Sequence, residues 1–295
     1  MTKATRNRRA NQRGQKADAQ NTDGQERAIA RPLEVSMLGG WTERRMHRHR
    51  ASLDALPWGT LEPERHPRAH VDHARAMWTN GIFTEYASAA AFSQLVTALV
   101  ESGAPIDLTA ACADIVVDEM THVELVSRVV LELGGAVPYE MDLDRITQLP
   151  DPGATPLMRA AELAITTSCV GESLSVPALR SSRALVGGGL LHGVLDRLVR
   201  DEGPHAQLGI QFLAWAGDRL TRGDRERLAA IALDAVAVYA PLWQTSEPAD
   251  APALGATPRD DYRALMTAAV RDKIDARLVR HGIVMDRAKL AALVE

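Results

Sequence analysis

Two pentapeptides of this chain combine a carboxylate and an imidazole at a spacing suited to metal binding. They read Asp-Glu-Met-Thr-His, ending at His122, and Asp-Glu-Gly-Pro-His, ending at His205. In each, the glutamate (Glu119 or Glu202) stands three residues before the histidine, so both side chains lie on one face of a helix, about one turn apart. Carboxylate and imidazole groups are common ligands of divalent metals. The two pentapeptides therefore predict two parts of a metal site.

A lone glutamate precedes each pentapeptide within a stretch of small and apolar residues. Glu85 stands in Ile-Phe-Thr-Glu-Tyr-Ala, and Glu172 stands in Cys-Val-Gly-Glu-Ser-Leu. The chain thus repeats a helix with one glutamate followed by a helix with Glu-x-x-His. Two copies supply four carboxylates and two imidazoles, which is the ligand set of di-iron and di-manganese helical bundles. We predict that these six residues bind two metal ions and carry the catalysis.

A single Glu-x-x-His is also compatible with a chance spacing of surface side chains, and the surroundings decide between the two interpretations. Apolar residues surround the candidate ligands, including Val123 and Leu125 after His122 and Leu174 after Glu172. Two buried carboxylates about 5 Å apart repel each other by about 3 kcal/mol at an effective dielectric constant of about 20, in addition to their desolvation cost. Two divalent ions neutralise four carboxylates, so metal binding is the favoured interpretation.

An aspartate precedes each motif glutamate. A histidine that binds a metal needs an acceptor for its other ring N–H. In a bundle with approximate two-fold symmetry, we expect Asp118 to reach His205 and Asp201 to reach His122. The alternative is that both aspartates are charges on a helix surface.

Long helices must hold these residues, and the composition favours them. Of 295 residues, 46% are hydrophobic but only 4% are aromatic, so few positions suit a pleated sheet. We predict an all-α fold, a ferritin-like four-helix bundle with one long crossover plus additional C-terminal helices. Residues 137–156, with four prolines, form the crossover, and Pro177 and Pro204 should bend their helices. The predicted helices span about 71–102, 107–135 with Asp107 as N-cap, 157–185, 187–217, 224–239 and 260–281.

The domain organisation follows from these segments. Residues 1–31 are polar and basic, so we predict a disordered tail, and residues 32–70 are an irregular segment that wraps the bundle. The bundle with its dimetal site covers residues 71–218. Accessory C-terminal helices occupy residues 219–295, with a Pro/Ala-rich linker at 247–258.

Charge and apolar runs exclude several classes of function. A net charge of −4 and a pI near 6.2 argue against nucleic-acid and anionic-membrane binding, which need a basic field. No apolar run is long enough to span a membrane, and no secretory signal stands at the start. Two cysteines do not make a disulfide framework. We expect a cytoplasmic protein with reduced thiols.

With these residues in view, the chain resembles the ferritin-like di-iron carboxylate superfamily, in particular its bacterial oxygenases and oxidases, over residues 71–218. The resemblance implies that the six residues bind iron and that Glu119 and Glu202 bridge the two ions. The doubled Asp-Glu-x-x-His is similar to that of the bacterial multicomponent monooxygenases, in which the aspartate supports the ligating histidine. Aryl-amine N-oxygenases have a further histidine where this chain has Leu198, so N-oxidation is not favoured.

The leading hypothesis is an oxidoreductase in which two iron ions, with manganese as the alternative for one or both, activate O₂ to oxidise an organic small molecule. Hydroxylation, desaturation and N-oxidation share this apparatus, and an electron-donor protein or another reductant is the implied partner. A homodimer is compatible with this function. Small residues, namely Ala89, Gly171 and Ser175, leave space for a substrate. The rival hypotheses are a ferritin-like ferroxidase or peroxide-removing iron-handling protein, and a metal-free helical scaffold.

Overall fold

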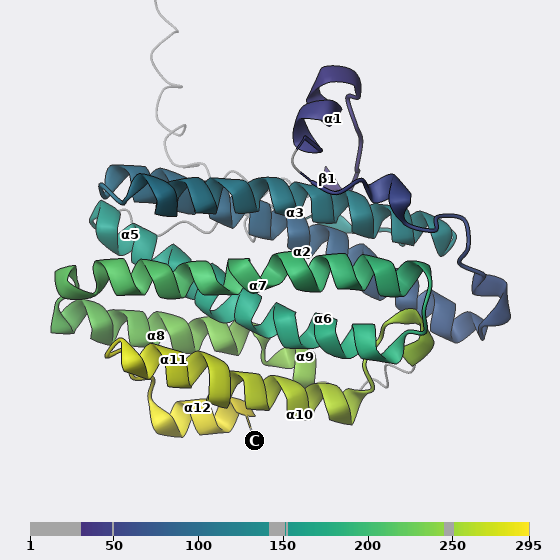
Figure 1. The fold of residues 1–295 in the computed structure, drawn as a ribbon. Coiled ribbons are helices and arrows are strands. Elements are labelled where there is room, and N and C mark those ends of the chain that lie inside the picture. The colour runs from purple at the N-terminus through teal and green to yellow at the C-terminus, as the bar shows by residue number, and fades with distance from the viewer. Residues whose placement is uncertain (1–30, 49, 142–150, 152, 245–250, 295) are drawn as a thin grey trace, which may run out of the picture.

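Four long helices form the body of the protein. The computed structural model describes residues 31–48, 50–141, 151, 153–244 and 251–294. α2 and α3 form one layer of the bundle, and α7 with the third long helix forms the next (Figure 1). The prediction of an all-α four-helix bundle is confirmed. The four helices are α2 (Arg68–Glu101), α3 (Ile106–Glu132), a continuous helix made of α5 (Pro156–Leu163), η3 (Ala164–Glu172) and α6 (Ser173–Leu185), and α7 (Leu190–Ala216).

The starts of the helices show which capping predictions hold. α5 begins at Pro156, and the Thr155 hydroxyl accepts a hydrogen bond from the N–H of Met158 at 3.2 Å, which satisfies one free donor of the first turn. The prediction that Asp107 caps α3 was wrong. This helix begins one residue earlier, directly after Pro105, whose side chain makes no capping hydrogen bond. Asp107 lies inside the first turn, where its negative charge favours the helix N-terminus.

One stretch of the third long helix, η3, is π-helical, and it ends at Glu172. Pro177 and Pro204, where we expect local bends, lie inside α6 and α7, which are α-helical on both sides of each proline. The π-helical stretch packs closely against α7 at Gly209. A Cβ added at Gly209 would lie only 2.6 Å from the Sγ of Cys169. Glycine at this position lets the two backbones pack directly against each other.

Shorter helices cover the outer face of the third long helix (Figure 1). The prediction of a linker at 247–258 was wrong for residues 251–258, which pack against the bundle. Ala251, Leu254 and Ala256 are buried, and the Leu254 carbonyl accepts a hydrogen bond from the indole of Trp78 at 3.0 Å. Residues 245–250 lie outside the described residues. The elements of this region are α8 (Arg222–Tyr239), α9 (Pro241–Gln244), η5 (Pro252–Leu254), α10 (Arg259–Ala269), η6 (Val270–Asp275), α11 (Ala276–Arg280) and α12 (Arg287–Val294), with the turn η4 (Gly217–Arg219) before them.

The segment before α2 lies against α3. The Gly59 N–H donates to Glu132 at 2.6 Å, and the guanidinium of Arg128 lies 4.0 Å from the ring centre of Trp58. The elements here are β1 (Arg31–Pro32), α1 (Gly40–Met46), η1 (Leu53–Ala55) and η2 (Pro63–Arg65), and β1 pairs antiparallel with β2 (Glu140–Met141).

The predicted tail, apart from Arg31, and half of the predicted crossover at 137–156 fall on residues 1–30, 142–150 and 152, outside the described residues. Over the described part of the chain, no helix combines the length and the apolar character needed to cross a membrane.

Candidate metal centre

All four long helices deliver a candidate ligand to the interior of the bundle. α2 carries Glu85 and η3 ends in Glu172. α3 carries Glu119 with His122, and α7 carries Glu202 with His205, each pair one turn apart as the spacing predicts. Five of the six are buried, and the Glu85 side chain is 14% exposed. The structure therefore brings together all six residues that the sequence singled out.

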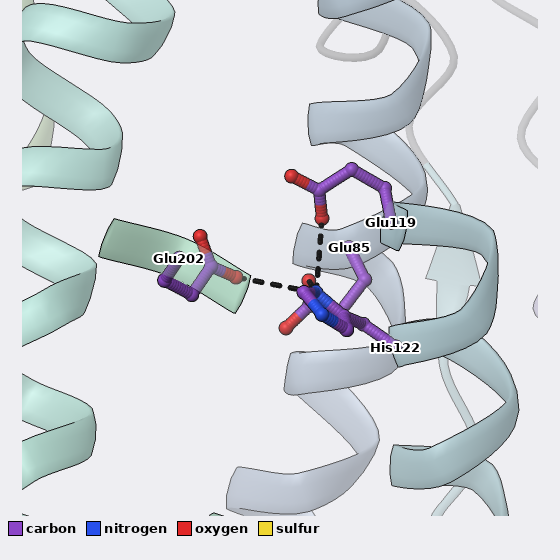
Figure 2. Close-up of side chains that lie close together, drawn as sticks. All are labelled: Glu85, Glu119, His122 and Glu202. Carbon is purple, nitrogen blue, oxygen red and sulfur yellow. Dashed lines mark ion pairs between the residues drawn. The ribbon is translucent and has the colours of Figure 1, made fainter. Parts of the chain in front are cut away.

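The six side chains form two overlapping groups, each with ligand atoms within 4.8 Å of one another. One group contains Glu85 and His122, and the other contains Glu172 and His205. Glu119 and Glu202 belong to both groups. Figure 2 shows the first group, in which three carboxylates from α2, α3 and α7 surround one imidazole. Two shared carboxylates with one further Glu and one His on each side are the pattern of two adjacent cation sites with two bridging ligands.

The first group contains a buried nitrogen that the protein leaves unsatisfied. His122 Nδ1 lies 3.4 Å from Glu85 Oε2, 3.5 Å from Glu119 Oε2 and 3.2 Å from Glu202 Oε1. It makes no hydrogen bond within the described residues, and neither does Glu119 Oε2. Unpaired buried polar atoms are costly and uncommon. A divalent cation among these atoms would satisfy both of them, so the residues fit a metal ion.

The second group is tied together by a serine. His205 Nδ1 lies 3.0 Å from Glu202 Oε2 and 3.1 Å from Glu119 Oε1. The Ser88 hydroxyl lies within hydrogen-bond distance of Glu119 Oε1, at 3.0 Å, and of Glu172 Oε1, at 2.7 Å. The sequence analysis missed Ser88, although it stands three residues after Glu85 and therefore on the same face of α2.

Each aspartate contacts the histidine of the opposite pentapeptide. Asp201 Oδ2 lies 3.4 Å from His122 Nε2. Asp118 Oδ2 lies 3.6 Å from His205 Nε2, slightly beyond hydrogen-bond distance. This crossed pairing is the one expected from the two-fold repeat. It directs Nδ1 of each imidazole toward the carboxylates and fixes the ring orientation that a metal ligand needs.

Two arginines that the sequence analysis did not single out hold these aspartates. Arg50 donates to Asp118 at 2.9 Å and also to the backbone carbonyl and carboxylate of Asp114. Arg197 forms an ion pair with Asp201 from one turn earlier on α7. The segment before α2 therefore contributes Arg50 to the environment of the cluster.

Burial and mutual repulsion shift the protonation of the cluster. Burial raises the pKa of Glu85 to about 8, and burial followed by the charges of its carboxylate neighbours raises the pKa of Glu172 well above its usual range. Burial disfavours charged imidazoles, but the surrounding carboxylates outweigh it and raise the pKa of His122 well above its usual value and that of His205 to about 12. Without a metal, the cluster holds protons that cations would displace.

A cavity of about 580 Å³ adjoins the cluster, and Glu85, Glu172 and Glu202 form part of its wall. Gly171 and Ser175 line it, as expected for small residues that leave space for a substrate, whereas Ala89 does not. A second cavity, of about 630 Å³, lies between residues 33–54 and α3 and is lined by none of the six candidate ligands. The first cavity is therefore the one with access to the metal centre.

Comparisons with known proteins support the fold. No protein-family model and no curated protein sequence matches the chain. A solved structure described as protein 19 with aldehyde deformylating oxidase activity, from Synechococcus, is similar with a TM-score of 0.56 and 16% sequence identity, over 79% of this chain and 99% of that one. At this identity the likeness shows the fold and not the reaction. The chain therefore has the ferritin-like fold and carries within it a carboxylate and histidine cluster compatible with a di-iron site.

Proposed function

We propose that this protein is an oxidoreductase in which two iron ions, bound by the six-residue cluster, activate O₂ to oxidise an organic small molecule. The observation that carries the proposal is the pair of overlapping ligand groups that share Glu119 and Glu202, next to a cavity of substrate size. Iron bound there would supply the O₂ reduction chemistry, which protein side chains lack. Aldehydes are among the candidate substrates because of the activity ascribed to the Synechococcus protein.

The residues of this chain have three roles in the proposed reaction. The four glutamates would hold and neutralise the two cations, and three of them, Glu85, Glu172 and Glu202, line the cavity where a substrate would bind. Asp118 and Asp201, held by Arg50 and Arg197, keep the imidazoles oriented. The burial of the cluster excludes bulk water from the reacting centre.

A reductant is part of the proposal. Reduction of O₂ to water takes four electrons, and a two-electron oxidation of the substrate supplies only two of them. The other two must come from an electron-donor protein or a small reductant. The cavity beside the cluster favours this function over iron handling alone, because oxidation of ferrous ions needs no space for an organic molecule.

The first experiment measures metal content after anaerobic loading with ferrous iron and then O₂ consumption with a chemical reductant. We expect two irons per chain. We expect His122→Ala and His205→Ala each to lower metal affinity or activity at least tenfold, since even changes next to a ligand cost about that much. The control is His192→Ala, because His192 lies on the same helix as His205 but outside both ligand groups.

The outcomes separate the hypotheses. Fewer than one metal ion per chain, or full metal content and O₂ consumption in both cluster variants, would contradict the proposed function. O₂ consumption that never depends on any organic compound, with iron accumulating in a large symmetric shell, would support the iron-handling alternative.

A further inference from the structure

The walls of the cavity beside the cluster carry no positive charge. Among the described residues that line it there is no Lys, Arg or His, and its only ionisable acids are the cluster glutamates. Two divalent ions would neutralise the four carboxylates of the cluster. A charged ligand would then meet no counter-charge in the chain, and a buried charge without a partner is strongly disfavoured.

Most of the remaining wall is apolar, and much of its apolar part comes from the C-terminal helices. Tyr239 of α8, Leu242 and Trp243 of α9, and Tyr262 and Met266 of α10 lie opposite the ligand-bearing helices. Aromatic, aliphatic and thioether groups favour ligands that bury apolar surface. The volume of about 580 Å³ is within the range that holds a medium-sized organic molecule.

One hydroxyl of the wall is left without a partner. Thr167 lies in η3, is 7% exposed and lines the cavity, and its Oγ1 makes no hydrogen bond within the described residues. The other threonine of the wall, Thr84, donates to the Gly81 carbonyl at 2.9 Å, and Ser88 donates to the cluster glutamates. A buried hydroxyl without a partner is costly, so a hydrogen bond to a bound molecule would be favourable. The Thr167 Oγ1 is itself buried beside the cavity, so the side chain must turn toward the bound molecule to make this bond.

We propose that this cavity binds an uncharged, largely apolar organic substrate whose polar group hydrogen-bonds to Thr167. The inference rests on the proposed function only in that it treats the bound molecule as the substrate of the metal centre. Thr167 is a positioning and specificity residue here, and it is not a metal ligand. The corresponding carboxylic acid of the same chain length is excluded by charge.

The first test compares two probes of equal length, 1-decanol and decanoate. Binding is measured by calorimetry on the full-length chain without O₂, with and without iron, because a carboxylate also binds iron directly. We expect decanoate to bind at least tenfold more weakly than 1-decanol to the metal-free protein, and the iron-loaded form then shows how much direct binding to iron adds. Equal or tighter binding of decanoate to the metal-free protein would overturn the charge argument.

A second test adds the missing positive charge. Leu242 lies at the cavity and is 58% exposed, so Leu242→Lys should fold and should strengthen decanoate binding at least threefold. Val100→Lys is the matched control, because Val100 is 65% exposed on α2 and does not line the cavity. Unchanged decanoate binding in the Leu242 variant, or the same gain in the Val100 variant, would refute the placement of the ligand.

A third test examines the hydroxyl. Thr167→Val keeps the shape of the side chain, and loss of one hydrogen bond of ordinary strength should weaken 1-decanol binding about fivefold. Thr166→Val is the control, since the Thr166 hydroxyl donates to the Glu162 carbonyl at 3.0 Å and the residue does not line the cavity. Equal effects in both variants, or none in the Thr167 variant, would overturn the assignment.

The two proposals fail in different ways. If 1-decanol binds as predicted but no organic compound, charged or uncharged, stimulates O₂ consumption by the iron-loaded chain, the proposed function fails and the binding site stands. If O₂ consumption depends on an organic acid that binds this cavity, the oxidase stands and the inference fails.

Discussion

The contact between Arg197 and Asp201 gives the sharpest test of how the cluster is supported. Arg197 and Arg200 both contact this carboxylate, but Arg197 is 9% exposed whereas Arg200 is 60% exposed and lies 3.5 Å away. Asp201 in turn contacts His122. Replacing each arginine by methionine keeps most of the side-chain volume and removes the charge. The prediction is that only the buried arginine matters.

The expected change in the free energy of unfolding follows from the pKa of Asp201. Burial acts to raise it, but His122 and then Arg197 lower it from 3.8 to about 2. This lowering corresponds to about 2.5 kcal/mol of stabilisation at neutral pH. Because two partners share it, we expect Arg197→Met to lower the free energy of unfolding by about 1–2 kcal/mol. We expect Arg200→Met to change it by less than about 0.5 kcal/mol, as for an exposed pair.

Urea unfolding of the metal-free chain at several pH values provides the assay. A carboxylate with a lowered pKa stabilises the folded state above its unfolded pKa of 3.8, and this stabilisation is lost as the pH falls through about 2. The difference between wild type and Arg197→Met should therefore be constant from pH 7 to 5 and smaller at pH 3. Equal losses in the two arginine variants, or a difference that grows on acidification, would refute the reasoning.

Three further predictions follow. Burial raises the pKa of Glu85 to about 8, so its protonation should add up to about tenfold per pH unit to the loss of iron affinity as the pH drops below 8. The slope should be shallower by that amount in Glu85→Gln when metal binding is titrated from pH 6 to 9. Gly209→Ala should cost about 1–3 kcal/mol in urea unfolding because its Cβ would meet Cys169, whereas Gly203→Ala on the same helix has open space and should be neutral or stabilising. Thr155→Ala should cost about 1 kcal/mol in the same assay through loss of the cap; no change would contradict the assigned cap.

The cluster was predictable because its spacing is local. Glu119 with His122 is visible in the sequence, since three residues make about one helical turn. The lone glutamates were visible because a charged side chain among small and apolar residues is unusual for a buried helix face. The repeat then supplied the crossed pairing of the aspartates with the opposite histidines. None of these steps required knowledge of which helices touch.

The other parts of the site depend on contacts between segments that are far apart in the sequence, so the sequence did not reveal them. Arg50 reaches Asp118 from 68 residues away, and nothing in its spacing distinguishes it from the other arginines of its segment. Arg197 had a usable signal, because it stands four residues before Asp201 on the same helix face. The π-helical geometry of η3 left no recognisable pattern in the sequence, and the close contact of Gly209 with that stretch joins two different helices.

The candidate ligands and much of the apolar cavity wall occupy separate stretches of the chain. All six ligands lie between Glu85 and His205, whereas much of the apolar wall lies beyond Val238. Mutations in the later stretch can reshape the chamber without moving a ligand. Under the proposed function, the C-terminal helices could therefore be randomised to change which compounds bind while all six candidate ligands stay unchanged.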